Sequence, residues 1–273
     1  MVEKIMEIPA MILAGGPTPT SLQTVTQEPE RAFIPLLGKP IIAHTIDNIR
    51  GSMFLSSITV IGNVDRLKEE FKDDDFTYID DAGSLLENLM NGLKSLEQHR
   101  KVLILTADIP LITTNIIAST LLECEKIDAD CYYPIVMKSI IEKKFPGGKR
   151  TYIPLREGQF SGGNVFLVNP KALLRNEAVF KRLIKDRKNV VKLVSFLGLS
   201  FLLMMIFGLL DIRILEKKAS KILGVSVKAI ISPSAELAVD IDKEKDFIDV
   251  TRYMEKKRDN DNRSSINSSL KTD

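Results

Sequence analysis

The feature that most constrains the fold is an apolar run near the N-terminus that stops on two glycines. Residues 8–14 read Ile-Pro-Ala-Met-Ile-Leu-Ala, and Gly15 and Gly16 follow. An uninterrupted apolar run of this length is typical of a parallel strand buried on both faces. Glycine allows a backbone to turn its N–H groups toward an anion at close range. The pattern therefore predicts a buried first strand that opens into a phosphate-binding loop.

A second apolar run brings a carboxylate to the place where a strand should end. Residues 101–108 read Lys-Val-Leu-Ile-Leu-Thr-Ala-Asp, and open α/β sheets bind ligands at the carboxyl ends of their strands. Far downstream, Asp240 and Asp242 follow another apolar segment, and we expect only one of them to face this edge. Carboxylates from distant segments suit Mg²⁺, with phosphate oxygens and water completing the octahedron. The sequence therefore predicts a nucleotide site with Mg²⁺ bound by Asp108 and one of these two residues.

Composition narrows the class of protein. The chain has 273 residues, a net charge of +2 and two cysteines, Cys124 and Cys131, which lack metal-ligand spacing. We expect no nucleic-acid partner, because nucleic-acid-binding surfaces carry a clear basic excess. Free cysteines fit a reducing compartment, and Glu3 and Glu7 interrupt any N-terminal signal segment. These features predict a cytoplasmic protein, and they leave its oligomeric state open.

Strand-like and helix-like segments alternate along the first half of the chain. Apolar residues at helical spacing predict helices over residues 41–49, 64–71, 84–96 and 114–126. Between them, runs of β-branched and aromatic residues predict strands over residues 57–62 and 76–79. This alternation predicts an α/β fold: a three-layer α/β/α sandwich with a mostly parallel sheet covered by helices on both faces.

The second half is less regular, as we expect of the part that supplies the acceptor side of the pocket. The predicted strands cover residues 130–136, 163–168 and 227–231. The predicted helices cover residues 170–197 and 212–223, and a closing helix begins near Lys243. From Lys256 onward the chain is polar and lacks apolar periodicity. We therefore predict one domain over residues 1–255 and a disordered polar tail over residues 256–273.

One segment leaves two interpretations open. Residues Leu193 to Leu210 contain no charged side chain, and this length touches the lower limit for a membrane span. Ser195, Gly198 and Ser200 divide the run into short pieces, which favours a buried helix. A membrane helix stays the alternative because the preceding flank is basic. The basic flank consists of Lys181, Arg182, Lys185, Arg187, Lys188 and Lys192.

Four motifs carry a resemblance to a known family. They are Leu13-Ala14-Gly15-Gly16, the segment from Arg31 to Pro40, the segment from Thr106 to Leu111, and Val239-Asp240-Ile241-Asp242-Lys243. In order and spacing the chain resembles the MobA-like NTP transferases, the molybdenum-cofactor guanylyltransferase-like group. The resemblance implies a nucleotide-diphospho-sugar transferase fold, which is GT-A-like and Rossmann-like. It also implies transfer of a nucleoside monophosphate from an NTP to a phosphorylated small-molecule acceptor, with release of pyrophosphate.

The resemblance also implies roles for individual residues. Nucleotide binding is expected of Leu13, Ala14, Gly15, Gly16, Gly83, Ser84 and Asn88. Acceptor binding is expected of Ser161, Gly162, Gly163 and Asn164. Catalysis is expected of Arg31, Lys39 and Asp108, and metal binding of Asp108, Asp240 and Asp242.

The chain departs from the family pattern directly after the glycine pair. Related chains continue with Gly-x-Gly-x-Arg-Met and a lysine, whereas residues 17–22 here read Pro-Thr-Pro-Thr-Ser-Leu. Arg31 stands where a Lys-Ala pair is common, and it can neutralise phosphate charge, as can Lys39. The departure concerns the catalytic rate and the choice of NTP more than the fold.

Three functions remain open from the sequence. The first is an Mg²⁺-dependent nucleotidyltransferase, which we favour. The second is a non-catalytic nucleotide-binding or regulatory protein on the same fold, suggested by the altered loop. The third is a membrane-associated variant that acts on a lipid-linked phosphate through the apolar segment 193–210. The sequence does not specify the NTP or the acceptor.

Overall fold

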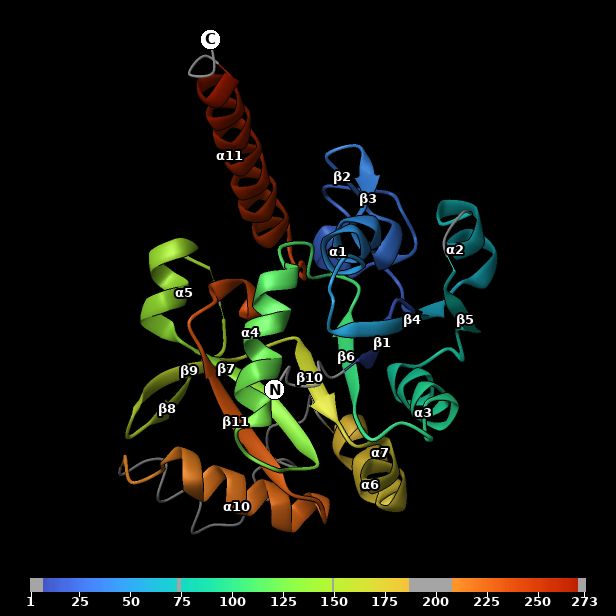
Figure 1. The fold of residues 1–273 in the computed structure, drawn as a ribbon, viewed down its shortest axis with the longest axis vertical. Helices are drawn as coiled ribbons and strands as arrows, with labels where there is room; N and C mark the ends of the chain where they lie inside the picture. Colours follow the sequence, from blue (N-terminus) through green and yellow to red (C-terminus); the bar gives the residue numbers. More distant parts are fainter. Residues whose placement is uncertain (1–6, 73–74, 149, 187–207, 270–273) are drawn as a thin grey trace.

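A mixed sheet forms the middle layer of the molecule, and helices cover both of its faces (Figure 1). The computed structural model describes residues 7–72, 75–148, 150–186 and 208–269. Its central strands are β1 (Ile8–Leu13), β4 (Leu55–Gly62), β5 (Thr77–Asp80), β6 (Val102–Thr106), β7 (Cys131–Met137), β8 (Ile153–Leu155), β9 (Gly158–Gly162), β10 (Val165–Val168) and β11 (Val227–Ser232). They pair in the order β5-β4-β1-β6-β10-β7-β9-β8, and β11 also pairs with β7. Strands β2 (Pro35–Leu36) and β3 (Lys39–Pro40) form a separate small sheet.

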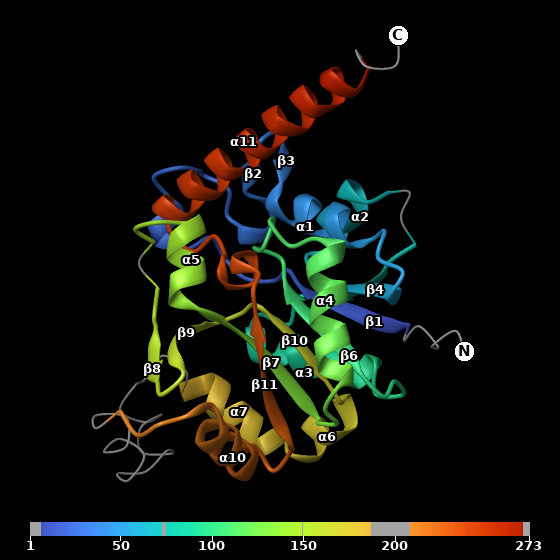
Figure 2. The same cartoon turned by 60° about the vertical axis from the view of Figure 1, so that its left-hand side comes forward.

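Helices form the two outer layers. They are α1 (Ile41–Ile49), α2 (Val64–Glu70), α3 (Leu85–Ser95), α4 (Thr114–Glu125), α5 (Lys138–Lys144), α6 (Pro170–Arg175), α7 (Glu177–Asp186), α10 (Ile212–Leu223) and α11 (Glu244–Ser269). Helices α1, α2, α4, α5 and α11 contribute buried side chains to one hydrophobic core, whereas α3, α6 and α7 contribute to the other. Helix α10 lies against β11 and α7, as Figure 2 shows from a second direction.

Strand β1 lies between the two cores. Ile8, Ala10 and Ile12 belong to the first core, and Met11 and Leu13 belong to the second. Successive side chains of a strand point to opposite faces, so a strand covered on both sides must be apolar throughout. All six residues of β1 are buried. The prediction of a buried first strand is confirmed.

Strand direction changes halfway along the sheet. Strands β5, β4, β1 and β6 run parallel to their neighbours. Strand β10 then pairs antiparallel with both β6 and β7, and the hairpin β8–β9 is also antiparallel, whereas β11 is parallel to β7. The structure confirms the α/β three-layer architecture, in which antiparallel strands extend a parallel half. The hairpin was not predicted, because its sequence contains few β-branched residues.

The helix predicted over residues 170–197 is divided in its described part. Helix α6 ends at Arg175 and α7 begins at Glu177. Between them, the side-chain amide of Asn176 donates hydrogen bonds to the carbonyls of Ala172 and Gly224. Asparagine side chains compete in this way with the helical backbone, which explains the break. The remainder, residues 187–197, lies outside the described residues.

The predicted disordered tail is helical as far as Ser269, because α11 continues through the polar region (Figure 1). Val250 in its first half is fully buried, and Phe247 and Tyr253 pack against the same core. Helix formation has a costly nucleus but adds further residues at little cost. The packed first half therefore supplies the nucleus from which a polar sequence continues as a helix.

The apolar segment 193–210, for which a membrane helix was the alternative interpretation, lies mostly outside the described residues, which resume at Gly208. In the part of the chain that the structure describes, no helix has both the length and the hydropathy needed to cross a bilayer.

Candidate functional site

A pocket of about 1120 Å³ lies at the carboxyl ends of β1 and β6. Parallel strands bring ligand-binding groups together at this edge. All seven residues predicted to bind nucleotide line this pocket: Leu13, Ala14, Gly15, Gly16, Gly83, Ser84 and Asn88. Arg31, Asp108, Asn164, Asp240 and Asp242 line it as well. The tertiary structure thus brings most of the predicted site residues to one place.

The glycine loop depends on both glycines. Gly16 has a φ of +116°, which residues with a Cβ rarely adopt. At Gly15 a Cβ would lie 2.4 Å from the side-chain nitrogen of Asn88, so no larger residue fits without a shift. The N–H of Ala14 donates to the carbonyl of Ile61 at 2.7 Å and is therefore committed to the sheet. Of the backbone donors expected at residues 14–16, this leaves the N–H groups of Gly15 and Gly16.

Helix α3 forms the neighbouring wall, and the Ser84 side chain caps its N-terminus. The Ser84 hydroxyl accepts a hydrogen bond from the N–H of Glu87 and donates one to the Glu87 carboxylate at 2.8 Å. Asn88, which is buried, uses its amide to accept from the N–H of Ala82 and to donate to Asp81, both at 2.8 Å. The Asn88 side chain therefore shapes the loop before α3. Asp81 lines the pocket beside Asn88 and was not among the residues predicted to bind nucleotide.

Three carboxylates that line the pocket lie close together. One oxygen from each of Asp108, Asp240 and Asp242 lies within 4.8 Å of the other two. The expectation that only one of the last two would face this edge was wrong. Both follow a buried hydrophobic residue in an extended segment outside any regular strand, and extended residues two apart point to the same side. The N–H of Ile241 donates to the Asp108 carbonyl at 3.1 Å and fixes the segment beside β6.

Arg31 connects the glycine loop to this cluster. Its guanidinium donates to the Asp108 carboxylate and forms an ion pair with Asp242 at 2.8 Å. Its backbone N–H donates to the carbonyl of Gly16 at 3.3 Å. Burial by itself would lower the pKa of Arg31, but the charges of Asp108 and Asp242 more than offset this, so the pKa is raised. Arg31 is therefore a fixed positive charge inside the pocket.

The surroundings of Asp240 shift its pKa. Burial, together with the charges of Asp108 and Asp242, raises its pKa to about 7. Arg150, which was not among the predicted site residues, opposes this effect through its positive charge. It lies 3.5 Å from Asp240 and 3.7 Å from Asp246, and its side chain is 10% exposed. No sequence pattern marked Arg150, because it lies in a loop far from the carboxylates along the chain.

The carboxylate cluster has the properties of a site for a divalent cation. Asp108 Oδ1 is buried, and among the described residues no group donates a hydrogen bond to it. A buried acceptor without a partner is costly, and crowded carboxylates repel one another. A hard divalent cation would satisfy the unpartnered oxygen and remove the repulsion. The residues present therefore fit a cation such as Mg²⁺.

Some predicted site residues lie elsewhere. Lys39 does not line the pocket, and its ammonium group pairs with Asp47 on α1 at 2.7 Å. Of the predicted acceptor loop, Asn164 lines the pocket, whereas the other three residues do not. Two of them have packing roles. A Cβ at Gly162 would overlap the Tyr133 ring, and one at Gly163 would lie 3.2 Å from two backbone carbonyls.

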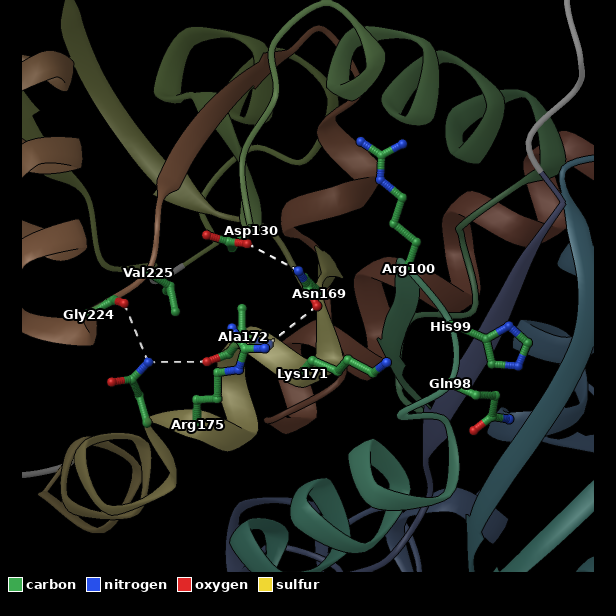
Figure 3. Close-up of a pocket in the computed structure, with 11 residues that line it drawn as sticks. Gln98, His99, Arg100, Asp130, Asn169, Lys171, Ala172, Arg175, Gly224 and Val225 are labelled. Carbon is green, nitrogen blue, oxygen red and sulfur yellow. Dashed lines mark hydrogen bonds between the residues drawn. The ribbon is translucent and has the colours of Figure 1, made fainter.

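A smaller pocket of about 470 Å³ lies at the opposite edge of the sheet, beside the starts of β6 and β7. Figure 3 shows that polar side chains there bond to one another and to the backbone. Asp130 accepts a hydrogen bond from Asn169 at 3.2 Å, and Asn176 donates to the carbonyls of Ala172 and Gly224. These bonds tie α6 to the residues around β11. The carboxylate cluster lies at the other edge.

Comparison with known proteins identifies the family. A model of the MobA-like NTP transferase domain matches residues 10–145, which include the glycine loop, Arg31 and Asp108. A solved structure of a hypothetical transferase from Thermus thermophilus is 31% identical, with a TM-score of 0.77, and the match covers 89% of this chain and 100% of that one. The chain belongs to the MobA-like NTP transferase family. This MobA-like chain is therefore a nucleotidyltransferase.

More distant structures share the fold of this MobA-like transferase. The 4-diphosphocytidyl-2C-methyl-D-erythritol synthase of Anaerococcus prevotii is 14% identical, with a TM-score of 0.57, over 92% of this chain and 96% of that one. A CMP:2-keto-3-deoxy-manno-octonic acid synthetase, solved in complex with CTP, is 12% identical, with a TM-score of 0.56, over 92% and 99%. At these identities the likeness concerns the fold alone. The comparison with curated protein sequences gave no match.

Proposed function

We propose that this MobA-like transferase moves a nucleoside monophosphate from an NTP to a phosphorylated small-molecule acceptor, releases pyrophosphate and requires Mg²⁺. The observation that carries the proposal is the convergence of Asp108, Asp240 and Asp242 in the pocket formed by the glycine loop. Carboxylates from separate segments, together with phosphate oxygens, are the ligand set that Mg²⁺ prefers. The unpartnered oxygen of Asp108 supports the same assignment.

The reaction needs positioning and charge stabilisation more than proton transfer. An oxygen of the acceptor phosphate attacks the α-phosphorus in line with the bond to the bridging oxygen. The new P–O bond forms as the old one breaks, and the electron pair leaves with pyrophosphate. An acceptor phosphate is already ionised near neutral pH, so no general base is required. Mg²⁺, when bound, would neutralise part of the charge on the phosphates.

Residues of the chain would bind the phosphates and the metal ion. The N–H groups of Gly15 and Gly16 would donate to phosphate oxygens from one wall of the pocket. The Arg31 side chain is 30% exposed, and its guanidinium would donate to the same phosphates as negative charge grows on them. Asp108, with Asp240 and Asp242, would hold the metal ion.

Further parts of the proposal concern the surroundings of the reaction. Gly83 and Ser84 would lie against the base and ribose, and Asn164 would face the acceptor. We assign residues 1–255 to one transferase domain. Both cysteines are free and buried, which supports a cytoplasmic location.

The test combines ligand binding with turnover. Thermal unfolding of the wild-type protein should be measured with ATP, GTP, CTP and UTP, each with and without Mg²⁺. A ligand at a hundred times its dissociation constant stabilises the folded state by about 2.7 kcal/mol, which raises the melting temperature by about 5–10 °C for a chain of this size. Pyrophosphate release should then be measured with the preferred NTP and a set of phosphorylated acceptors.

Asp108→Asn is the matched variant, because it keeps the shape of the side chain and removes its charge. We expect it to lose the metal-dependent part of the stabilisation and nearly all pyrophosphate release. Tight NTP binding without turnover, for any acceptor tried, would favour the non-catalytic alternative. Absence of stabilisation by all four NTPs would contradict the proposal.

A further inference from the structure

The pocket contains few positive charges for a site that would bind a triphosphate. Among the described residues that line it, Arg31 and Lys243 are the two cations, whereas four aspartates line it. Arg31 already pairs with Asp108 and Asp242. Binding an NTP would add several negative charges to this pocket. Lys243 is therefore the second cation that could neutralise the phosphates.

The Lys243 ammonium group is available to bind phosphate. The side chain is exposed, and in the described part of the chain it makes neither a hydrogen bond nor an ion pair. Burial raises the pKa of nearby Asp246, and the charge of Lys243 partly opposes this rise. Two other lysines differ in this respect. Lys245 pairs with Asp249 at 2.7 Å, and Lys39 pairs with Asp47 at the same distance. Lys243 is thus a cation at the pocket that is not neutralised by a paired carboxylate.

The position of Lys243 compensates for the altered glycine loop. Residues 17–22 contain no lysine or arginine. The hydroxyl of Ser21 in this loop donates to the backbone carbonyl of Asp242 at 2.6 Å, so the loop touches the residue next to Lys243. Lys243 also directly precedes α11, whose positive N-terminal end points back toward the same segment. Lys243 therefore places a cation beside the loop that lacks one.

We infer that Lys243 is a catalytic residue that binds the β- and γ-phosphates of the NTP and neutralises the leaving pyrophosphate. The inference rests on the proposed function. As the bond between the α-phosphorus and the bridging oxygen breaks, its electron pair passes to pyrophosphate. An ammonium group on a flexible stem can stay bound to these oxygens as their charge grows.

The test compares three single variants. Lys243→Met removes the charge and keeps the length of the stem, and Lys243→Arg keeps a charge. Lys245→Met is the matched control, because it removes a neighbouring lysine that already has a partner. Calorimetric titration with the NTP, NDP and NMP of the preferred base, in the presence of Mg²⁺, measures the affinity for each phosphate. The unliganded melting temperature of each variant checks folding.

We expect Lys243→Met to weaken NTP binding about tenfold to hundredfold, the usual worth of a charged hydrogen bond. NMP binding should change less than about twofold, because the NMP lacks the phosphates that Lys243 would contact. Lys243→Arg should recover most of the affinity, and Lys245→Met should match the wild type. Unchanged NTP affinity, or equal losses for NTP and NMP, would overturn the role of Lys243 and leave the proposed function standing. Failure of the wild-type protein to bind any NTP would overturn both.

Discussion

Replacing Asp240 by asparagine should change how the stability of the metal-free protein depends on pH. Burial and the charges of Asp108 and Asp242 raise the pKa of Asp240 from an ordinary value of 3.8 to about 7. The folded state therefore binds this proton more tightly than the unfolded state does. A carboxyl group whose pKa is raised in the folded state lowers the free energy of unfolding as the pH rises from about 4 to about 7. Asp240→Asn removes this dependence, because the amide does not ionise.

The size of the effect follows from the pKa difference. Each pKa unit is worth about 1.4 kcal/mol, so ionised Asp240 costs the folded state up to about 4 kcal/mol. Between pH 5 and pH 8 this cost grows by about 3 kcal/mol, so the free energy of unfolding of the wild type falls by that amount. The free energy of unfolding of Asp240→Asn, relative to the wild type, should therefore rise by about that amount over this interval.

Urea unfolding at pH 5 and pH 8, in the presence of a chelator, measures this difference. Asp128→Asn, at a side chain that is 87% exposed, is the control and should follow the wild type. Added Mg²⁺ should restore stability at pH 8 to the wild type more than to Asp240→Asn, since a cation removes the repulsion among the carboxylates. Parallel pH curves for wild type and Asp240→Asn would refute the argument that this carboxylate is crowded.

Two further predictions test the glycine loop and the residue behind the cluster. Gly15→Ala should destabilise the protein by about 1–3 kcal/mol and weaken NTP binding, because the new Cβ would lie 2.4 Å from the Asn88 amide. Gly51→Ala, with nothing within 4 Å of the new Cβ, should do neither in the same thermal assay. Arg150→Met should cost about 3–5 kcal/mol in urea unfolding, because it leaves the half-buried carboxylates of Asp240 and Asp246 without their cation. A loss below about 1 kcal/mol would show that this ion pair contributes little.

Much of the fold could be predicted because its signals are local. The apolar run of β1 indicates burial on both faces, and the helical spacing of apolar residues over 84–96 predicts α3 to within one residue at each end. Helix α11 and the break at Asn176 were not predicted correctly. In both, a contact with a distant segment outweighs the local pattern: α11 is nucleated by core packing, and Asn176 bonds to Gly224.

In the candidate site, too, contacts with distant segments decide what the local sequence pattern does not. Lys39 looked equivalent to Arg31 as a cation near the glycine loop, yet it pairs with Asp47 on α1. Arg31 instead reaches Asp108 and Asp242. Both lysine and arginine have long side chains, so the partner is decided by which carboxylate the fold brings within reach. Sequence spacing does not contain that information.

The sequence by itself determined the buried strands, the glycine loop and a carboxylate at the end of β6, because each depends on neighbouring residues and on the period of two or 3.6 that sets their directions. Only the tertiary structure decided that Asp240 and Asp242 both join Asp108, that Arg150 supports them and that Lys243 faces the pocket. These groups come from segments far apart in the chain. Their distances are set by how strands register and helices pack, and the resulting charges act on one another only after the chain has folded.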